Sequence, residues 1–540
     1  MIEVTLQVQL DSPVAEVPRR LFGTFVEHMG RSVYEGIYEP GHPTADGNGF
    51  RQDVLDLVRE LGATTVRYPG GNFVSGYRWE DGVGPVDERP VRLDGAWHST
   101  ETNRIGLHEF AGWAKGAGLE LMQAVNLGTR GVAEAAELLE YANHRSGTAL
   151  SDRRRANGAD EPFDILLWCL GNEMDGPWQI GFKTADEYGR LAAETARYMR
   201  FIDHRVELVA AGSSNMDMPT FGDWERTVLR HTAGLIDHIS LHAYFEEIDG
   251  DVGSFLASGV GLDRYIETVA GIIDDVVFEQ GITRSIGISV DEWNVWYVSR
   301  WNDVDKNAVL AGDWPQHPRL IEDEYNVTDA VVVGSLLISL LRHADRVSMA
   351  NLAQLVNVIA PIRCEPGGPA WRQATFHPFA LTAALARGRV LRSSVTAPTM
   401  ETTRYGRVDV VDATSTIDDD GTIALFVVNR SPDAAVDFTT TFTAEFSSGL
   451  TVPFTTWLTG SDHHAGPELD LVSAQTVTIP EGRDRFATNT AQEQPVVPRA
   501  LLPVQCGLVP SGSRVQATLP PLSWTVFTLR PTSTQDGDRD

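Results

Sequence analysis

Two short segments of the chain each place a glutamate at the carboxyl end of an apolar, strand-like run. The first, GNEM at residues 171–174, contains Glu173, and the second, DEWN at residues 291–294, contains Glu292. In barrel enzymes the catalytic side chains lie at the carboxyl ends of the parallel strands. Two carboxylates from two different strands predict cleavage of a sugar acetal, because that reaction uses one carboxyl group as an acid and another as a nucleophile or stabilising charge.

Other polar side chains also fall at the ends of predicted strands, as a pocket for sugar hydroxyls would require. They are Glu27, His28, Arg67, Asn72, Asn126, His242, Tyr244 and Gln354. Taken singly, each is more often structural than functional. Asn172 is suited to hydrogen-bond the ring hydroxyl beside the scissile bond, and Trp178 offers a flat face for stacking on a sugar. We expect Arg67 to hold Glu292 ionised, because a nearby cation favours the carboxylate.

Composition narrows the function classes. At 540 residues the chain is too long for one ordinary core, and its formal charge of −30 disfavours nucleic acid and anionic membranes as partners. Without a basic leader, a bilayer-spanning apolar run or a disulfide framework, the sequence predicts a cytoplasmic protein. Its histidines lack the spacing of a zinc site, and it has no phosphate-binding glycine loop or G-x-S-x-G elbow, so we expect neither a metal nor a cofactor.

From about residue 20 to residue 390, short β-rich runs alternate with helical stretches, which is typical of repeated βα units. The predicted strands are 21–26, 64–68, 120–126, 165–170, 207–211, 238–242, 286–290 and 346–351. Predicted helices include 52–61, 132–143, 185–201, 262–278 and 327–342. Eight such repeats predict an α/β fold, a (β/α)₈ TIM barrel. A doubly wound open sheet is the alternative, disfavoured because no G-x-G-x-x-G follows the first strand.

Beyond residue 390 the pattern changes to strands separated by Gly, Pro and Asp turns, which predicts an all-β sandwich. The N-terminal strand is expected to join it. The predicted organisation is a catalytic barrel at 14–388, a β-sandwich made of 1–13 plus 389–530, and a disordered tail at 531–540. The polar stretch 461–497, interrupted by a short strand at 474–479, is expected to be a long surface excursion.

The motifs at residues 25–31, 67–73, 171–179 and 291–294, with a closing strand at 519–524, resemble those of the bacterial α-L-arabinofuranosidases of glycoside hydrolase family 51. This resemblance covers essentially the whole chain. It implies a (β/α)₈ barrel followed by a jelly-roll domain, and retaining, exo-acting hydrolysis of terminal arabinofuranosyl groups. It also implies an arabinose-containing oligosaccharide as substrate, assembly as a hexamer, and no need for a metal.

By the same resemblance, Glu173 is the general acid/base and Glu292 the nucleophile. Glu27, Arg67, Asn72, Asn172, His242, Tyr244 and Gln354 would contact the furanose or orient the two glutamates, while Trp97 and Trp296 would frame the entrance. Double displacement requires carboxyl groups about 5–5.5 Å apart. Two alternatives remain at this stage: an endo-acting glucanase or xylan-cleaving enzyme of the same family, and a non-catalytic carbohydrate-binding barrel.

Overall fold

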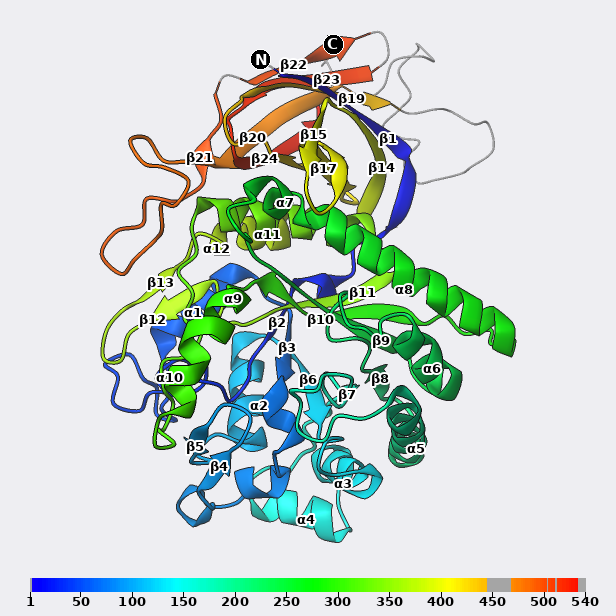
Figure 1. Cartoon of the computed structure of the whole chain (residues 1–540), viewed down its shortest axis with the longest axis vertical. Coiled ribbons are helices and arrows are strands. Elements are labelled where there is room, and N and C mark those ends of the chain that lie inside the picture. The colour runs from blue at the N-terminus through cyan, green and yellow to red at the C-terminus, as the bar shows by residue number, and fades with distance from the viewer. Residues whose placement is uncertain (1, 444–467, 503, 510–511, 533–540) are drawn as a thin grey trace, which may run out of the picture.

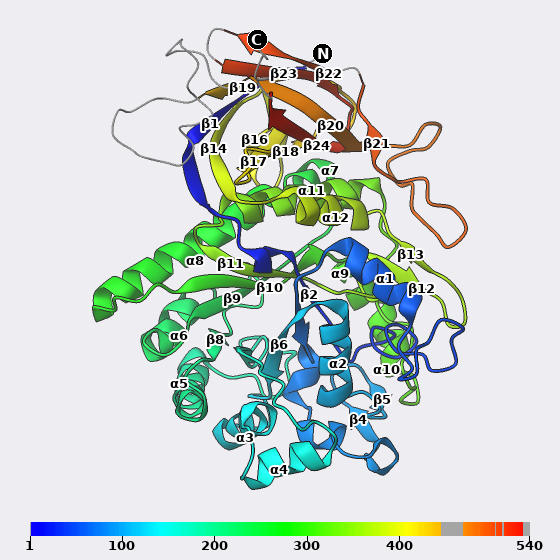
Figure 2. The same ribbon diagram turned by 180° about the vertical axis from the view of Figure 1, so that it is seen from behind.

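The computed structural model describes residues 2–443, 468–502, 504–509 and 512–532. Eight parallel strands close into a barrel surrounded by helices, and a mostly-β domain lies against one side of it (Figures 1 and 2). The barrel strands are β2 (Gly23–Phe25), β3 (Thr65–Tyr68), β6 (Glu120–Val125), β7 (Leu167–Leu170), β8 (Glu207–Ala210), β9 (His238–Phe245), β10 (Gly287–Val295) and β11 (Val347–Leu352). The predicted (β/α)₈ barrel with a second, β-rich domain is confirmed.

Two barrel strands are longer than the sequence predicts. β9 continues past His242 to Phe245, and β10 continues past Val290 to Val295. The two extensions pair with each other, from Glu292 opposite His242 to Val295 opposite Phe245. Glu292 therefore lies inside a strand rather than just after one, because its neighbour strand continues beside it and keeps the backbone hydrogen-bonded.

Most of the predicted helices match the structure closely. They are α1 (Gln52–Leu61), α3 (Val132–Asn143), α5 (Ala185–Ile202), α8 (Ser258–Gln280) and α11 (Val327–Arg342). The remaining long helices around the barrel are α2 (Leu107–Ala117), α4 (Ala149–Ala156), α6 (Asp223–Thr232) and α12 (Phe376–Leu385). Among the described residues, no helix is long and apolar enough to cross a lipid bilayer.

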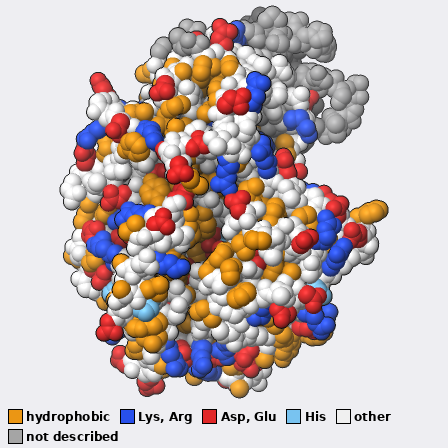
Figure 3. Space-filling view, in the orientation of Figure 1, with side chains coloured by type: hydrophobic (Ala, Val, Ile, Leu, Met, Phe, Trp, Pro, Cys, Tyr) orange, Lys and Arg blue, Asp and Glu red, His pale blue; other side chains and the backbone are white. Residues whose placement is uncertain are grey.

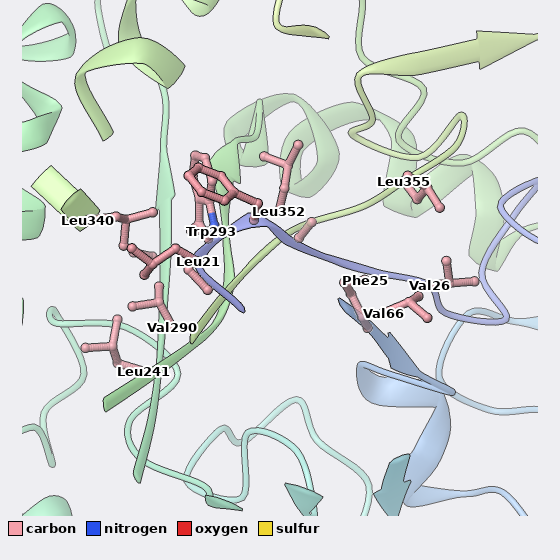
Figure 4. Close-up of a cluster of buried hydrophobic side chains, with 14 of the residues drawn as sticks. Leu21, Phe25, Val26, Val66, Leu241, Val290, Trp293, Leu340, Leu352 and Leu355 are labelled. Carbon is pink, nitrogen blue, oxygen red and sulfur yellow. The ribbon is translucent and has the colours of Figure 1, made fainter. Parts of the chain in front are cut away.

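Helix α11 lies between the barrel and the β domain. Every residue from Val327 to Leu341 is buried, as expected for a mostly apolar helix enclosed between two domains. Gly334 allows close contact with the β domain, because a Cβ there would stand 2.1 Å from Cδ1 of Trp524. Figure 4 shows the barrel side of this core, to which Leu340 of α11, Leu241 and Trp293 belong. One face of the β domain thus shares a continuous apolar core with the barrel.

The β domain is built around the N-terminal strand, β1 (Ile2–Glu16). Its sheet runs in the order β21 (Arg499–Ala500), β20 (Leu469–Val477), β24 (Ser523–Pro531), β18 (Ile423–Asn429), β17 (Val411–Ile417), β14 (Arg389–Thr396), β1, β19 (Val436–Thr443), β23 (Gly512–Leu519) and β22 (Val504–Val509). This continuous sheet curls, so strands from both halves share one core. The boundary predicted after residue 13 falls inside β1, and the division into two units stays a prediction.

The polar stretch at 461–497 is only partly a surface loop. Its first residues, 461–467, lie outside the described residues, and β20 then pairs with β24 inside the sheet. The segment that follows returns to the barrel, where Arg485 forms a salt bridge with Glu247 at 2.6 Å and Trp371 Nε1 donates to Asn489 O at 3.2 Å. This stretch thus connects the two domains. Of the tail predicted to be disordered, Pro531 belongs to β24, and residues 533–540 lie outside the described residues.

Candidate active site

The centre of the site is Arg67, a fully buried side chain of β3. Its Nη1 donates to Glu292 Oε1 at 2.8 Å, and its Nη2 donates to Asn172 Oδ1 at 2.7 Å. Asn172 precedes Glu173 in the turn after β7, whereas Glu292 belongs to β10. One guanidinium therefore connects the two segments that carry the predicted catalytic glutamates. It also supplies the cation expected beside Glu292.

The carboxyl groups of Glu173 and Glu292 face each other across His242 of β9. His242 Nδ1 lies 3.0 Å from Glu173 Oε1 and 3.6 Å from Glu292 Oε2, and these two carboxyl groups each have an oxygen within 4.8 Å of the other. Tyr244 donates its hydroxyl to Glu292 Oε2 at 2.7 Å. Burial lowers the pKa of His242, but the two carboxylates outweigh it and raise that pKa above its usual value. The short separation suits double displacement, because inverting enzymes hold their carboxyl groups roughly 6.5–9.5 Å apart.

The turn that carries Glu173 has an unusual backbone. Both Gly171, at φ +89°, and Glu173, at φ +44°, are left-handed. A non-glycine residue pays a conformational cost there, and such residues cluster at active sites. The turn is held by Gly176 N, which donates to Glu173 O at 2.9 Å, and by Ser214 N, which donates to Asp175 Oδ1 at 3.2 Å. These contacts keep the Glu173 carboxyl group at the mouth of the barrel.

Glu27 forms the opposite wall of the site and is 2% exposed. Its Oε1 accepts from the Phe73 amide at 2.8 Å and from the Trp97 indole at 2.7 Å. Gly71 permits this approach, since a Cβ there would lie 2.2 Å from Glu27 Oε2. Burial raises the pKa of Glu27 to about 8, although both donors oppose the rise. Near neutral pH the carboxyl group is therefore mostly protonated and has a proton to donate.

This shift predicts a pH-dependent stability difference between the wild type and Glu27→Gln. In the unfolded chain the carboxyl group titrates near its usual value of about 4.3, so wild-type stability falls as pH rises from there to about 8. Glutamine has no such charge to bury. We expect the variant's free energy of unfolding to exceed that of the wild type by a few kcal/mol at pH 9, on the order of 1.4 kcal/mol per pKa unit, and by far less at pH 5. Urea unfolding at both pH values measures this, and a difference independent of pH would contradict it.

The structure brings the predicted site residues together in two adjoining groups. Arg67, Asn72, Asn172, His242, Tyr244 and Trp296 surround the two glutamates, whereas Trp97 and Gln354 surround Glu27. Trp97, expected at the entrance, is 8% exposed and donates its indole N–H to Glu27. Two other polar residues at strand ends have structural partners: His28 bonds to Glu101 and Tyr68, and Asn126 bonds within its own turn. The individual roles of the site residues stay predictions.

Three further residues contact the site: Trp178, expected to stack on a sugar, and two that were not predicted as part of it, Trp301 and Asp291. Trp178, half exposed, donates its indole N–H to Glu173 Oε2 at 2.7 Å. Trp301 packs edge-on against Trp97 with ring centroids 5.9 Å apart, and Asp291 lies beside Arg67. The sequence signalled Trp178 as a stacking residue and Asp291 through the DEWN motif. Trp301 had no such signal, because it lies in a π-helical turn (Trp301–Asp305) of an irregular connection.

Glu173, His242 and Glu292 are also, among the described residues, the one group of acidic and histidine side chains close enough to share a metal ion. Both oxygens of Glu292 already accept hydrogen bonds, from Arg67 and from Tyr244. The guanidinium places a positive charge beside one of these oxygens, which disfavours a bound cation there. The arrangement therefore suits a carboxylate nucleophile better than a metal ligand, and the expectation of a metal-free enzyme stays a prediction.

Comparison with known proteins places this geometry in a family. Residues 57–249 match the α-L-arabinofuranosidase 1 domain, and residues 291–523 match the α-L-arabinofuranosidase C-terminal domain. An exo-α-(1→6)-L-arabinofuranosidase of Bifidobacterium longum is 54% identical over 98% of this chain and 97% of its own. The chain belongs to the family 51 α-L-arabinofuranosidases. The predicted family is therefore confirmed.

Other members of this family show the same agreement. An intracellular exo-α-(1→5)-L-arabinofuranosidase of Streptomyces lividans is 55% identical over 95% of this chain and 73% of its own. A solved structure, a family 51 α-L-arabinofuranosidase from B. longum, superposes with a TM-score of 0.87 at 45% identity over 98% of this chain and 99% of that one. These relatives favour neither the endo-acting alternative nor the non-catalytic one. Figure 3 shows a hollow near the centre of one face of the molecule, with hydrophobic and charged side chains around it.

Proposed function

We propose that this chain is a retaining, exo-acting α-L-arabinofuranosidase. It would hydrolyse terminal, non-reducing α-L-arabinofuranosyl groups of oligosaccharides derived from arabinan and arabinoxylan. The observation that carries the proposal is the pair Glu173, in the turn after β7, and Glu292, in β10 of a family 51 barrel, with carboxyl oxygens within 4.8 Å of each other and a buried arginine on one of them.

In the first step, the Glu292 carboxylate attacks the anomeric carbon of the arabinosyl group. The glycosidic bond breaks, and Glu173 gives its proton to the departing oxygen. In the second step, Glu173 takes a proton from water as that water attacks the anomeric carbon, and the bond to Glu292 breaks. Inversion at each step gives overall retention. Trp178 and His242, which hydrogen-bond the two oxygens of Glu173, would hold its carboxyl group in line with the departing oxygen.

The exo-acting mode is supported by the way one side of the site is closed. Trp97 precedes a short strand, β5 (Ser99–Glu101), and the connection after β10 is joined to that strand. Thr100 N donates to Pro315 O at 3.0 Å, and Thr100 Oγ1 donates to Trp314 O at 2.6 Å. Together with the contact between Trp97 and Trp301, these bonds build a wall across one end of the site. A blocked end favours removal of a single terminal sugar over binding in the middle of a chain.

The proposal is tested by incubating the purified protein with 4-nitrophenyl α-L-arabinofuranoside, arabinan oligosaccharides and carboxymethylcellulose. We expect release of 4-nitrophenol and free arabinose, with no fall in the viscosity of carboxymethylcellulose. Proton NMR during the first minutes should show the α-anomer of arabinofuranose before it mutarotates. Initial formation of the β-anomer would exclude the retaining mechanism, and a fall in viscosity would exclude the exo mode.

Location and assembly belong to the same proposal. We infer a cytoplasmic enzyme that acts on imported oligosaccharides, in keeping with the S. lividans relative, which is named as intracellular. We also infer a homo-oligomer, a hexamer by the family resemblance.

A further inference from the structure

The residue directly before Glu292 is a second buried carboxylate, Asp291, which is 2% exposed. β10 has a bulge at this point, because Val290 pairs with Leu241 and Glu292 pairs with the next residue, His242. In a regular strand, successive side chains point to opposite faces, and a bulge redirects one of them. Here the bulge lets both Asp291 and Glu292 reach the same guanidinium.

The guanidinium of Arg67 presents a different partner at each nitrogen. Nη1 donates to Glu292 and Nη2 to Asn172, while Nε, which makes no hydrogen bond, lies 3.6 Å from Asp291 Oδ2. The ring of Phe25 lies 5.1 Å from the guanidinium carbon and covers one of its faces. Asp291 is fixed in turn by a hydrogen bond from Ser289 Oγ to its Oδ1. Asp291 is thus a second negative charge beside Arg67, and it lies at the Nε edge of the guanidinium, which Glu292 does not contact.

We propose that Asp291 is a positioning residue that fixes Arg67 and limits how strongly Arg67 stabilises the charge of Glu292. The inference rests on the function proposed above. Two carboxylates that share one buried cation each receive less stabilisation than one carboxylate alone, and they also repel each other. Asp291 therefore keeps Glu292 more nucleophilic than Arg67 alone would leave it. A nucleophile of this kind attacks faster in the first step and leaves more slowly in the second.

Other charged or titratable groups also lie near Glu292 and Asp291, and all of them are still present in the variants that test the proposal. Glu292 is faced by Arg67, His242, Tyr244, Glu173 and Glu27, and Asp291 is faced by Arg67, Cys169 and Tyr188. None of them changes in an Asp291→Asn variant. A shift in pH dependence in that variant therefore reports the charge of Asp291 itself.

We expect Asp291→Asn to move the acidic limb of kcat/KM to lower pH by about 0.5–1 unit, because Glu292 then has the cation to itself. For oligosaccharides, whose leaving groups are poor, kcat/KM should fall about tenfold or more. For a 2,4-dinitrophenyl arabinofuranoside, whose hydrolysis is limited by the second step, kcat should stay the same or rise. Ser289→Ala is the matched control, since it removes a hydrogen bond from Asp291 but leaves the charge of Asp291 in place. In this variant the acidic limb of kcat/KM should not move.

The proposal is overturned if the acidic limb of kcat/KM does not move in Asp291→Asn, or if the substitution slows the first and the second chemical step equally. Either result would show that Asp291 is only structural. The burst of dinitrophenol counts active sites, so partial misfolding cannot imitate either result. If Asp291→Asn does not accumulate as folded protein, Asp291→Ala provides the same comparison. A wild type inactive on the aryl arabinofuranoside would instead refute the proposed function, which makes the two failures distinguishable.

Discussion

Glu292→Ala is expected to lower kcat by at least about 10⁴-fold on every arabinofuranoside, because it removes the carboxylate proposed to attack the anomeric carbon. The loss should be the same for good and poor leaving groups. The substitution also takes away one partner of the buried Arg67, which can cost several kcal/mol of stability. Glu292→Gln keeps the shape and a hydrogen-bonding oxygen, and it should show the same loss of turnover with a smaller drop in Tm.

Azide separates loss of the nucleophile from loss of the fold. A small anion can enter the space left in Glu292→Ala and attack the activated dinitrophenyl substrate directly, which gives the β-arabinosyl azide with inverted configuration. The matched control is Glu246→Gln, which removes a carboxylate at the same rim that bonds to Ser299; it should keep activity within about twofold. Appreciable turnover by Glu292→Ala without azide would rule out Glu292 as the nucleophile.

Glu173→Ala is expected to have an effect that depends on the leaving group. General acid catalysis contributes about 10²–10⁴-fold, and it matters most where the leaving oxygen is basic. We therefore expect kcat/KM to fall by about 10³-fold or more for an arabino-oligosaccharide, but by less than about tenfold for the dinitrophenyl substrate. For the latter, the arabinosyl-enzyme should accumulate, because no base is left to activate water.

Azide should rescue this variant with the opposite stereochemistry. It attacks the arabinosyl-enzyme without needing a base and gives the α-arabinosyl azide, so the two variants yield different anomers. Trp178→Phe is a useful companion, because it removes the indole N–H from Glu173 and leaves the carboxyl group. Equal losses for all leaving groups in Glu173→Ala would show that Glu173 is not the acid.

Much of the barrel could be predicted because its strands and helices have distinct local patterns. α1 and α3 have the predicted bounds, since each has apolar residues at helical spacing, and α1 also ends on a stop signal, the left-handed Gly62. The site followed from the barrel, because parallel strands bring their carboxyl ends to one mouth. That rule places Glu173, Glu292 and Arg67 together although they are far apart in the sequence.

What the sequence did not reveal depends on contacts between distant segments. The extension of β10 past Val290 depends on pairing with β9, and the polar residues that follow have no strand-like alternation. The bulge at Asp291 has no local signature, so its approach to Arg67 could not be foreseen. The inward placement of Trp97 depends on Trp301 and Glu27, which come from unrelated loops. In each case tertiary packing decides the position.

The central place of β1 in the β domain has a consequence for synthesis on the ribosome. Thr5 pairs with Thr396 and Ile2 pairs with Val436, so β1 is synthesised well before the strands with which it pairs. At about 5–20 residues per second, the delay is roughly 20–90 s. During that time the nascent chain carries an unpaired strand with alternating apolar residues, a template for association with other chains. The barrel can close early, whereas the β domain must wait until most of the chain has emerged.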